Sequence, residues 1–132
     1  PRESIDFNGN TGPFVQYTHA RICSILRKAD EAGIDYTSHN CTELLAEEIE
    51  LIKSLTDFPS IVASAGENLA PSIIAAYAYD LAKTFNGYYH DHSILKEEEV
   101  EKRRMRVMLA AMVARTINKA MKLLGIDVPQ RM

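Results

Sequence analysis

Apolar residues recur at helical spacing along most of this 132-residue chain, and this periodicity restricts its fold more than any other feature. The clearest case is the segment 96–124, where the residues that share one helix face are Val107, Ala110, Val113, Ile117, Ala120 and Leu124. Alternating runs of β-branched residues, which would indicate strands, are missing. The sequence therefore predicts an all-α protein.

Glycine and proline divide the chain into five expected helices. Pro13 suits the first turn of a helix that ends near Ala32, with Gly33 as its stop. The other segments are 42–55, capped by Thr42 or Asn40, then a short helix opened by the break at residues 57–59 and ending near Gly66, then 71–89, and finally 96–124 ended by Gly125. Each amphipathic helix must cover its apolar stripe with another helix, so we expect an antiparallel helical bundle of about five helices, formed as one domain over 1–132.

The first helix carries two distinct faces. The expected core face contains Val15, Ile22, Ile25, Leu26 and Ala29, and the adjacent face contains Phe14, Tyr17, Arg21, Ser24 and Lys28. Aromatic rings interleaved with cations suit single-stranded nucleic acid, because unstacked bases pile onto the rings while cations hold phosphates. In the alternative interpretation, Phe14 and Tyr17 only pack the start of the helix against a neighbour.

A second aromatic candidate closes the segment 71–89. Its expected core stripe is Ile74, Tyr77, Leu81, Phe85 and Tyr88. Tyr89 points roughly 80° away from Tyr88 by helical geometry, so we expect it to be exposed. An exposed Tyr near a helix end is also an ordinary surface feature.

Charge is unevenly distributed. The net charge of -3 argues against nucleic-acid binding if taken alone, but both ends of the chain are basic and the middle is acidic. On the last helix Arg104, Arg115, Lys119 and Lys122 lie near one another and are candidates for phosphate contacts. The alternative is a solvated face on which Lys102, Arg103 and nearby cations pair with the acidic residues Glu97, Glu98, Glu99 and Glu101.

Residues that could serve catalysis or bind metal form no familiar pattern. The spacing of His39, Cys41, His90 and His92 matches no familiar zinc site, so no metal is expected and a small helical metalloenzyme is an alternative to be checked by metal analysis. His19 and Cys23 have no evident orienting partner, so no catalytic residue is assigned. The two cysteines are expected to be free thiols. With no signal segment or membrane span and a first residue other than Met, we expect a cytoplasmic piece of a longer chain.

Three motifs resemble one known family. The run from Asn10 to Arg21, Asn-Thr-Gly-Pro-Phe-Val-Gln-Tyr-Thr-His-Ala-Arg, and its continuation Ser-Ile-Leu-Arg-Lys at 24–28 resemble the start of the anticodon-binding domain in arginyl-tRNA synthetases. The end of the chain, Leu-Leu-Gly-Ile-Asp-Val-Pro-Gln-Arg-Met at 123–132, is similar to that family's C-terminus. Residues 85–89 with Ile94 and Leu95 resemble its stretch before the last helix, so the similarity covers almost the whole chain.

The resemblance implies a DALR-type anticodon-binding domain, with residues 1–13 as the tail of a linker. Such a domain holds the anticodon loop of arginine tRNA and reads above all its middle cytosine. Phe14 and Tyr17 would pack against loop nucleotides, Tyr89 would stack on a base, and Met132 would lie at the anticodon. With the neighbouring polar residues, the predicted tRNA site comprises Phe14, Gln16, Tyr17, Arg21, Lys28, Tyr89, Arg115, Lys119, Arg131 and Met132. The family more often has Tyr where this chain has Phe14, which puts one hydroxyl contact in doubt.

The same resemblance sets expectations for the whole enzyme. Both signatures of the class I catalytic domain, His-Ile-Gly-His and Lys-Met-Ser-Lys-Ser, are absent from the chain. We therefore expect no cofactor here, ATP and Mg in the missing catalytic domain, and an arginine-tRNA ligase as the full-length parent. The expected partners are arginine tRNA and the catalytic domain of the same polypeptide, with a monomer as the binding unit. The alternative is a helical protein-interaction module whose exposed aromatics contact a protein.

Overall fold

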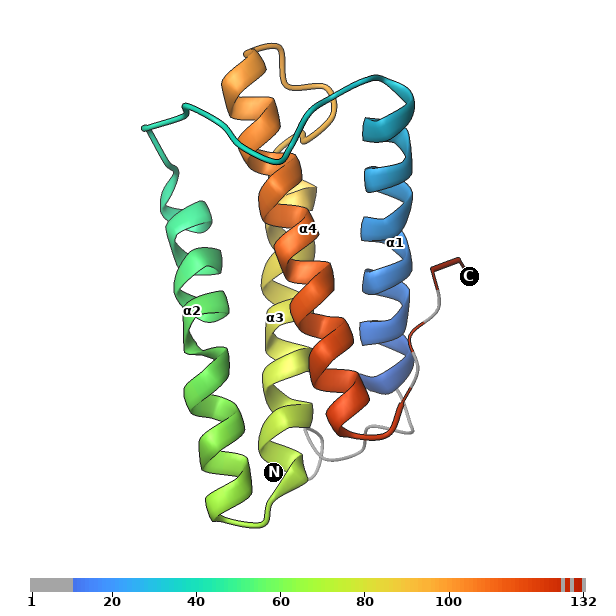
Figure 1. Ribbon diagram of the computed structural model, residues 1–132, viewed down its shortest axis with the longest axis vertical. Helices are drawn as coiled ribbons and strands as arrows, with labels where there is room; N and C mark the ends of the chain where they lie inside the picture. Colours follow the sequence, from blue (N-terminus) through green and yellow to red (C-terminus); the bar gives the residue numbers. More distant parts are fainter. Residues whose placement is uncertain (1–10, 127, 129, 132) are drawn as a thin grey trace.

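The computed structural model describes residues 11–126, 128, 130 and 131. They form four helices, α1 (Gly12–Glu31), α2 (Ala46–Glu67), α3 (Pro71–Asp91) and α4 (Val100–Leu123), and no strand occurs within this part of the chain. Figure 1 shows α1 and α3 running in one direction and α2 and α4 in the other. The predicted antiparallel all-α bundle is therefore confirmed. Residues 1–10 of the predicted linker lie outside the described residues, and Gly12 and Pro13 already belong to α1.

The helices α3 and α4 form the centre of the bundle. Both pack against α1 on one side and against α2 on the other. The connection 32–45 crosses one end of the bundle to reach α2, and the C-terminal tail turns back beside α1 (Figure 1). The helix that carries the predicted aromatic and basic face therefore lies next to both α3 and the tail.

The buried residues follow the predicted stripes on three helices. The largest buried apolar side chains include Ile22 of α1, Leu51 of α2, Leu81 and Phe85 of α3, and Ile117 and Met121 of α4. Leu26, Tyr77 and Leu124, which the sequence also assigned to core stripes, are only partly buried. On α2 the exposed side chains include Ile49 and Ile52, whereas Glu48 and Leu51 point inward.

The predicted break at Pro59 is wrong, since α2 continues through it. Proline removes one donor from the helix ladder, a defect that tertiary contacts can offset. Here the hydroxyl of Tyr77 on α3 donates to the carbonyl of Ser54 at 2.6 Å, and the Tyr77 ring lies 5.4 Å from that of Phe58. The two predicted helices are therefore a single helix held against α3.

Two predicted helix starts also need correction. The second helix begins at Ala46 and not at a cap formed by Thr42 or Asn40, because the backbone N–H of Leu45 is instead bound at 2.7 Å by the Glu48 carboxylate. The last helix begins at Val100, four residues later than expected. The predicted stops are confirmed, because Gly33 and Gly125 adopt positive φ angles of 72° and 76° at the ends of α1 and α4.

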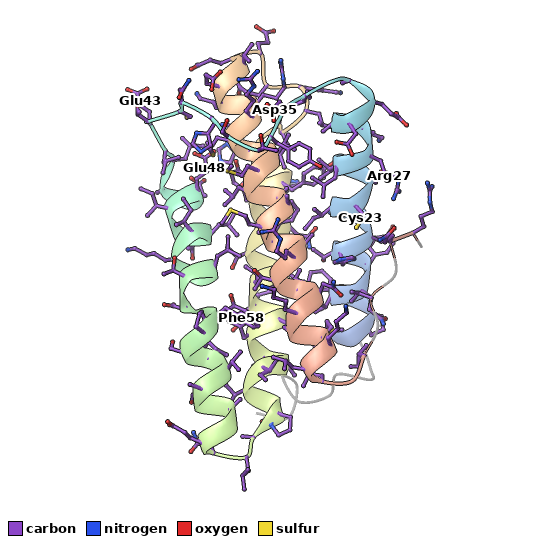
Figure 2. All side chains as sticks on the ribbon, viewed as in Figure 1. Cys23, Arg27, Asp35, Glu43, Glu48 and Phe58 are labelled. Carbon is purple, nitrogen blue, oxygen red and sulfur yellow. The ribbon has the colours of Figure 1, made fainter. Side chains whose placement is uncertain are left out.

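A buried polar cluster joins three helices near the end crossed by the 32–45 connection. Glu48, labelled in Figure 2, accepts hydrogen bonds at Oε2 from the Tyr88 hydroxyl at 2.7 Å and from Arg106 Nε at 3.1 Å. Arg106 Nη1 also donates to the carbonyl of Ser93 at 2.6 Å. Burial, followed by the bond to Glu48, raises the pKa of Tyr88 far above its usual value. The cluster fixes α2, α3 and α4 relative to one another.

None of the described helices combines the length and the apolar composition that crossing a membrane would require.

Candidate nucleic-acid interface

A groove of about 400 Å³ runs along α1. We call it the basic groove. Its walls come from α1, the last turns of α3, the segment that follows α3 and the C-terminal tail, and its lining residues are Tyr17, Ala20, Arg21, Ser24, Ile25, Arg27, Lys28, Tyr89, Leu95 and Arg131. Segments distant in the sequence thus meet on one side of the bundle.

The helix α1 supplies most of the groove because its positions i, i+4, i+7 and i+11 share one face. Tyr17, Arg21, Ser24 and Lys28 occupy these positions, and the neighbouring face buries Val15, Ile22, Ile25 and Ala29 in the core. The Tyr17 side chain is 58% exposed. The structure therefore offers an uncovered ring beside cations on a helix held firmly by its other face.

Tyr89 contacts both a ring and a cation. Its ring is nearly parallel to that of Phe85, at an interplanar angle of 15° and a centroid distance of 6.1 Å. The guanidinium carbon of Arg21 lies 5.1 Å from the Tyr89 centroid, within the range of a cation–π contact. Tyr89 is 37% exposed, so the exposure predicted from the sequence is confirmed.

Arg21 is held by the neighbouring helix. Its Nη1 donates to Asn86 Oδ1 at 2.6 Å, and Asn86 Nδ2 donates to Thr18 Oγ1 at 2.7 Å and to the carbonyl of Ala82 at 2.9 Å. The Thr18 hydroxyl in turn donates to the carbonyl of Phe14 at 2.9 Å. Every partner in this set is neutral, so the charge of Arg21 is not compensated within it.

The charge of the groove is positive. Arg21, Arg27, Lys28 and Arg131 line it, and none of the described lining residues is acidic. Arg27 Nη1 donates to the carbonyl of Gln130 at 3.2 Å, which ties the tail to α1. Figure 2 shows Arg27 projecting from α1 on the side where the tail lies. Cations gathered in a concave surface attract phosphate groups.

One thiol lies near the groove without lining it. Cys23 is labelled on α1 in Figure 2, and its Sγ lies 3.7 Å from Nδ1 of His19. Partial burial raises the pKa of the Cys23 thiol, and the charge of Arg27 opposes this shift. The raised pKa favours the thiol form, which is the poorer nucleophile. Cys23 and Cys41 are both unpaired, as expected from the sequence.

Five of the predicted site residues meet in the groove, namely Tyr17, Arg21, Lys28, Tyr89 and Arg131. Phe14 does not reach it, because its half-buried ring packs 5.5 Å from the ring of Tyr79. Gln16 is half-buried on α1 outside the lining, and Arg115 and Lys119 are exposed on α4, also outside it. Met132 lies outside the described residues.

Sequence reasoning missed three residues that shape the groove. Arg27 follows Ser24 by three residues, so helical geometry alone could have placed it beside the stripe. Asn86 gave no such signal, since its contacts to Thr18 and Arg21 depend on how α3 packs against α1. Leu95 lines the groove from a connection whose path the sequence did not predict.

The basic stripe expected on the last helix is divided. At the start of α4 the cations are paired with acids, Lys102 with Glu99 at 3.9 Å and Arg104 with Glu101 at 3.1 Å. The alternative of a solvated face therefore describes this first part of α4. Lys122 is exposed in its last turn.

The histidines make pairwise contacts. His92 Nε2 lies 3.1 Å from the carboxylate of Glu47, and His90 lies 3.1 Å from its neighbour Asp91. The hydrogen bond to His92 lowers the pKa of Glu47. His39 Nδ1 accepts the backbone N–H of Cys41 at 3.0 Å. Within the described ranges, His, Cys, Asp and Glu side chains form no group of three or more suited to a metal ion.

Comparison with protein families identifies a known domain family. Residues 15–132 match the family model described as the DALR anticodon binding domain. Curated relatives are similar over the whole chain: the arginine–tRNA ligase of Phocaeicola vulgatus is 56% identical and that of Flavobacterium psychrophilum is 52% identical. The chain spans 22% of the length of each of these relatives.

Solved structures give the same result. The arginyl-tRNA synthetase of Thermus thermophilus superimposes with a TM-score of 0.83 and 35% identity, over 96% of this chain and 22% of that one. The arginyl-tRNA synthetase of Plasmodium falciparum superimposes with a TM-score of 0.72 and 28% identity, over 94% of this chain and 22% of that one. The arrangement of the four helices is thus shared with both enzymes.

Proposed function

Because this chain belongs to the DALR anticodon-binding domain family, we propose that its basic groove binds the anticodon loop of a transfer RNA. The observation that carries the proposal is the meeting of an exposed Tyr17 ring, the Arg21–Tyr89 stack and three further cations in one groove. Unpaired loop nucleotides expose base faces and phosphates together. The groove offers partners for both.

The two kinds of contact divide among the lining residues. Tyr17 accepts a base on its uncovered face, and stacking on an aromatic ring is worth about 1–3 kcal/mol per base. Arg27, Lys28 and Arg131 hold phosphates and set the register of the loop. The Ser24 hydroxyl and the guanidinium N–H groups are among the polar groups able to meet a base edge.

For the whole protein we propose the activity of an arginine-tRNA ligase, with arginine tRNA as the RNA partner. The named relatives support this, since they are arginine–tRNA ligases similar to this chain over its full length. ATP and Mg²⁺ would then be used by a catalytic domain in the remainder of the polypeptide. That domain would also be the protein partner of this one.

Two further features fit this proposal. The groove of a single chain already supplies both rings and cations, and we propose a monomer as the binding unit. Both cysteines are unpaired, which suits the reducing cytoplasm in which protein synthesis takes place.

A titration with a labelled RNA hairpin tests the proposed binding. The hairpin carries the anticodon loop of an arginine tRNA, and the control has the same stem closed by a tight loop without free bases. We expect the anticodon hairpin to bind more strongly, with an affinity that falls as salt rises. Equal binding of the two hairpins would show that the groove attracts RNA through its charge alone and does not recognise loop bases. Absence of binding to either would favour the alternative of a protein-interaction module.

A further inference from the structure

Tyr89 contacts two neighbouring groups in the structure. Its ring is nearly parallel to that of Phe85, and the guanidinium carbon of Arg21 lies over it, 5.1 Å from the ring centroid. A base that approaches the side of Tyr89 where Arg21 lies therefore meets Arg21 first. A guanidinium group is planar and stacks on bases as well as on aromatic rings, so it can serve as the outer layer of the stack.

The position of Arg21 depends on Asn86. The side-chain amide of Asn86 has two N–H groups, and Nδ2 donates to Thr18 Oγ1 and to the carbonyl of Ala82. These two donations fix the orientation of the amide, so that Oδ1 must face Arg21, which binds it at 2.6 Å. Asn86 is thus oriented by α1 and by its own helix, and its fixed Oδ1 in turn restricts the position of the Arg21 guanidinium.

The neutrality of Asn86 has a further consequence. An aspartate at this position could still accept a hydrogen bond from Arg21, but it would lose the donations to Thr18 and Ala82 and would neutralise the charge that an RNA ligand needs. The amide oxygen instead fixes the guanidinium and leaves its full positive charge in the groove. Arginine otherwise loses considerable rotamer freedom on binding, so a preformed contact lowers the entropic cost.

We propose that Asn86 is a positioning residue for RNA binding, which holds the Arg21 guanidinium over Tyr89 so that the guanidinium receives an unstacked base. This inference rests on the proposed function of the basic groove. In it Tyr89 acts through Arg21, as the support beneath the guanidinium. Asn86 itself does not touch the RNA.

A double-mutant cycle separates this role from a purely structural one. We expect Asn86→Ala to weaken binding of the anticodon hairpin by about 3- to 10-fold, the amount expected when one long side chain must be ordered on binding. In an Arg21→Ala background the same substitution should leave the affinity unchanged, because Asn86 acts through Arg21. A structural contribution through Thr18 would instead weaken binding in both backgrounds.

The salt dependence of binding in a second variant tests whether the uncompensated charge of Arg21 contributes to RNA binding. Asn86→Asp retains an acceptor for Arg21 but adds a negative charge beside it, so it should reduce the slope of log K against log salt by about one ion, the signature of one lost cation. Thermal unfolding of each variant verifies that it is folded, and a control substitution, Asn118→Ala on α4, should change neither affinity nor slope.

The outcomes distinguish the inference from the proposed function. The positioning role is supported if the chain binds the hairpin, if Asn86→Ala weakens this binding, and if the same substitution has no effect in the Arg21→Ala background. If the hairpin binds but the two substitutions are additive, or Asn86→Asp leaves the salt slope unchanged, the positioning role is overturned and RNA binding stands. If the unsubstituted chain binds neither hairpin, both proposals are overturned.

Discussion

Oε2 of Glu48 on α2 lies 3.1 Å from Nε of Arg106 on α4, and the two side chains are only 1% and 6% exposed. Arg106 is also bound by Glu97 at 3.3 Å and by the carbonyl of Ser93. A buried ion pair of this kind gives little net stability over an apolar pair, but removing one partner leaves a charge buried without compensation. The contact therefore makes the bundle sensitive to substitution at either residue.

The first prediction concerns this pair. Arg106→Met should lower the free energy of unfolding by about 3–5 kcal/mol, because the Glu48 carboxylate then stays buried with only its neutral partners. Arg104→Met on the same helix is the matched control, since its pair with Glu101 is partly exposed and is worth about 0–1 kcal/mol. Urea unfolding monitored by circular dichroism measures both. Similar small decreases in the free energy of unfolding of the two variants would show that the buried pair matters no more for stability than the partly exposed one.

The second prediction concerns the response to alkaline pH. Burial, together with the charge of Asp57, raises the pKa of Tyr77 from 10.0 to about 12. A raised pKa means that the folded state favours the protonated phenol, so this contribution to stability is complete below pH 10 and is lost as the pH rises through 12. Tyr77→Phe should therefore reduce the loss of stability over this interval.

The same substitution has a cost at neutral pH. Tyr77→Phe removes the hydrogen bond to the Ser54 carbonyl and should lower the free energy of unfolding by about 1 kcal/mol. Unfolding curves recorded from neutral to strongly alkaline pH test both effects. An identical decline in the two proteins above pH 10 would exclude Tyr77 as its source.

The third prediction concerns Tyr17. Tyr17→Ala should weaken binding of the anticodon hairpin by about 5- to 150-fold, which corresponds to the loss of about 1–3 kcal/mol of stacking on one base. Tyr17→Phe keeps the ring and should retain most of the affinity. Ile52→Ala, an exposed apolar position on α2 outside the groove, serves as the control. Fluorescence anisotropy measures all three, and an unchanged affinity for Tyr17→Ala would remove Tyr17 from the interface.

The fourth prediction concerns the cations of the groove. Lys28→Ala should lower the slope of log K against log salt by about one ion, since one phosphate contact is lost. Arg27→Ala should do the same and also release the tail from α1, because Arg27 binds the Gln130 carbonyl. Lys53→Ala on α2, outside the groove, should leave the slope unchanged. If all three variants keep the slope of the unsubstituted chain, the phosphate contacts lie outside the basic groove.

The sequence predicted the helical bundle because helical periodicity and glycine stops are local signals. It failed at Pro59, where the local preference for a break is overcome by contacts between Phe58, Tyr77 and the Ser54 carbonyl. It also placed the start of α2 too early, because the Glu48 carboxylate and not a Thr or Asn cap binds the free N–H of Leu45. Both differences arise from tertiary contacts that no local pattern contains.

The candidate site, like the fold, could be predicted where it depends on local helix geometry and not where it depends on the packing of one helix against another. The stripe of Tyr17, Arg21 and Lys28 follows from the geometry of one helix, and the structure places these residues in one groove. The stacking of Arg21 on Tyr89 and the hydrogen bonds of Asn86 require the packing of α3 on α1. The burial of Phe14 against Tyr79 requires the same packing, and it separates Phe14 from a stripe to which its sequence position assigned it.

The most direct test of the central claim is a fluorescence titration of this chain with arginine tRNA and with a copy altered at the middle base of the anticodon, at low and moderate salt. We predict that the natural tRNA binds more tightly at both salt concentrations and that Arg21→Ala abolishes the difference. Equal binding of the two tRNAs would contradict anticodon recognition by the basic groove.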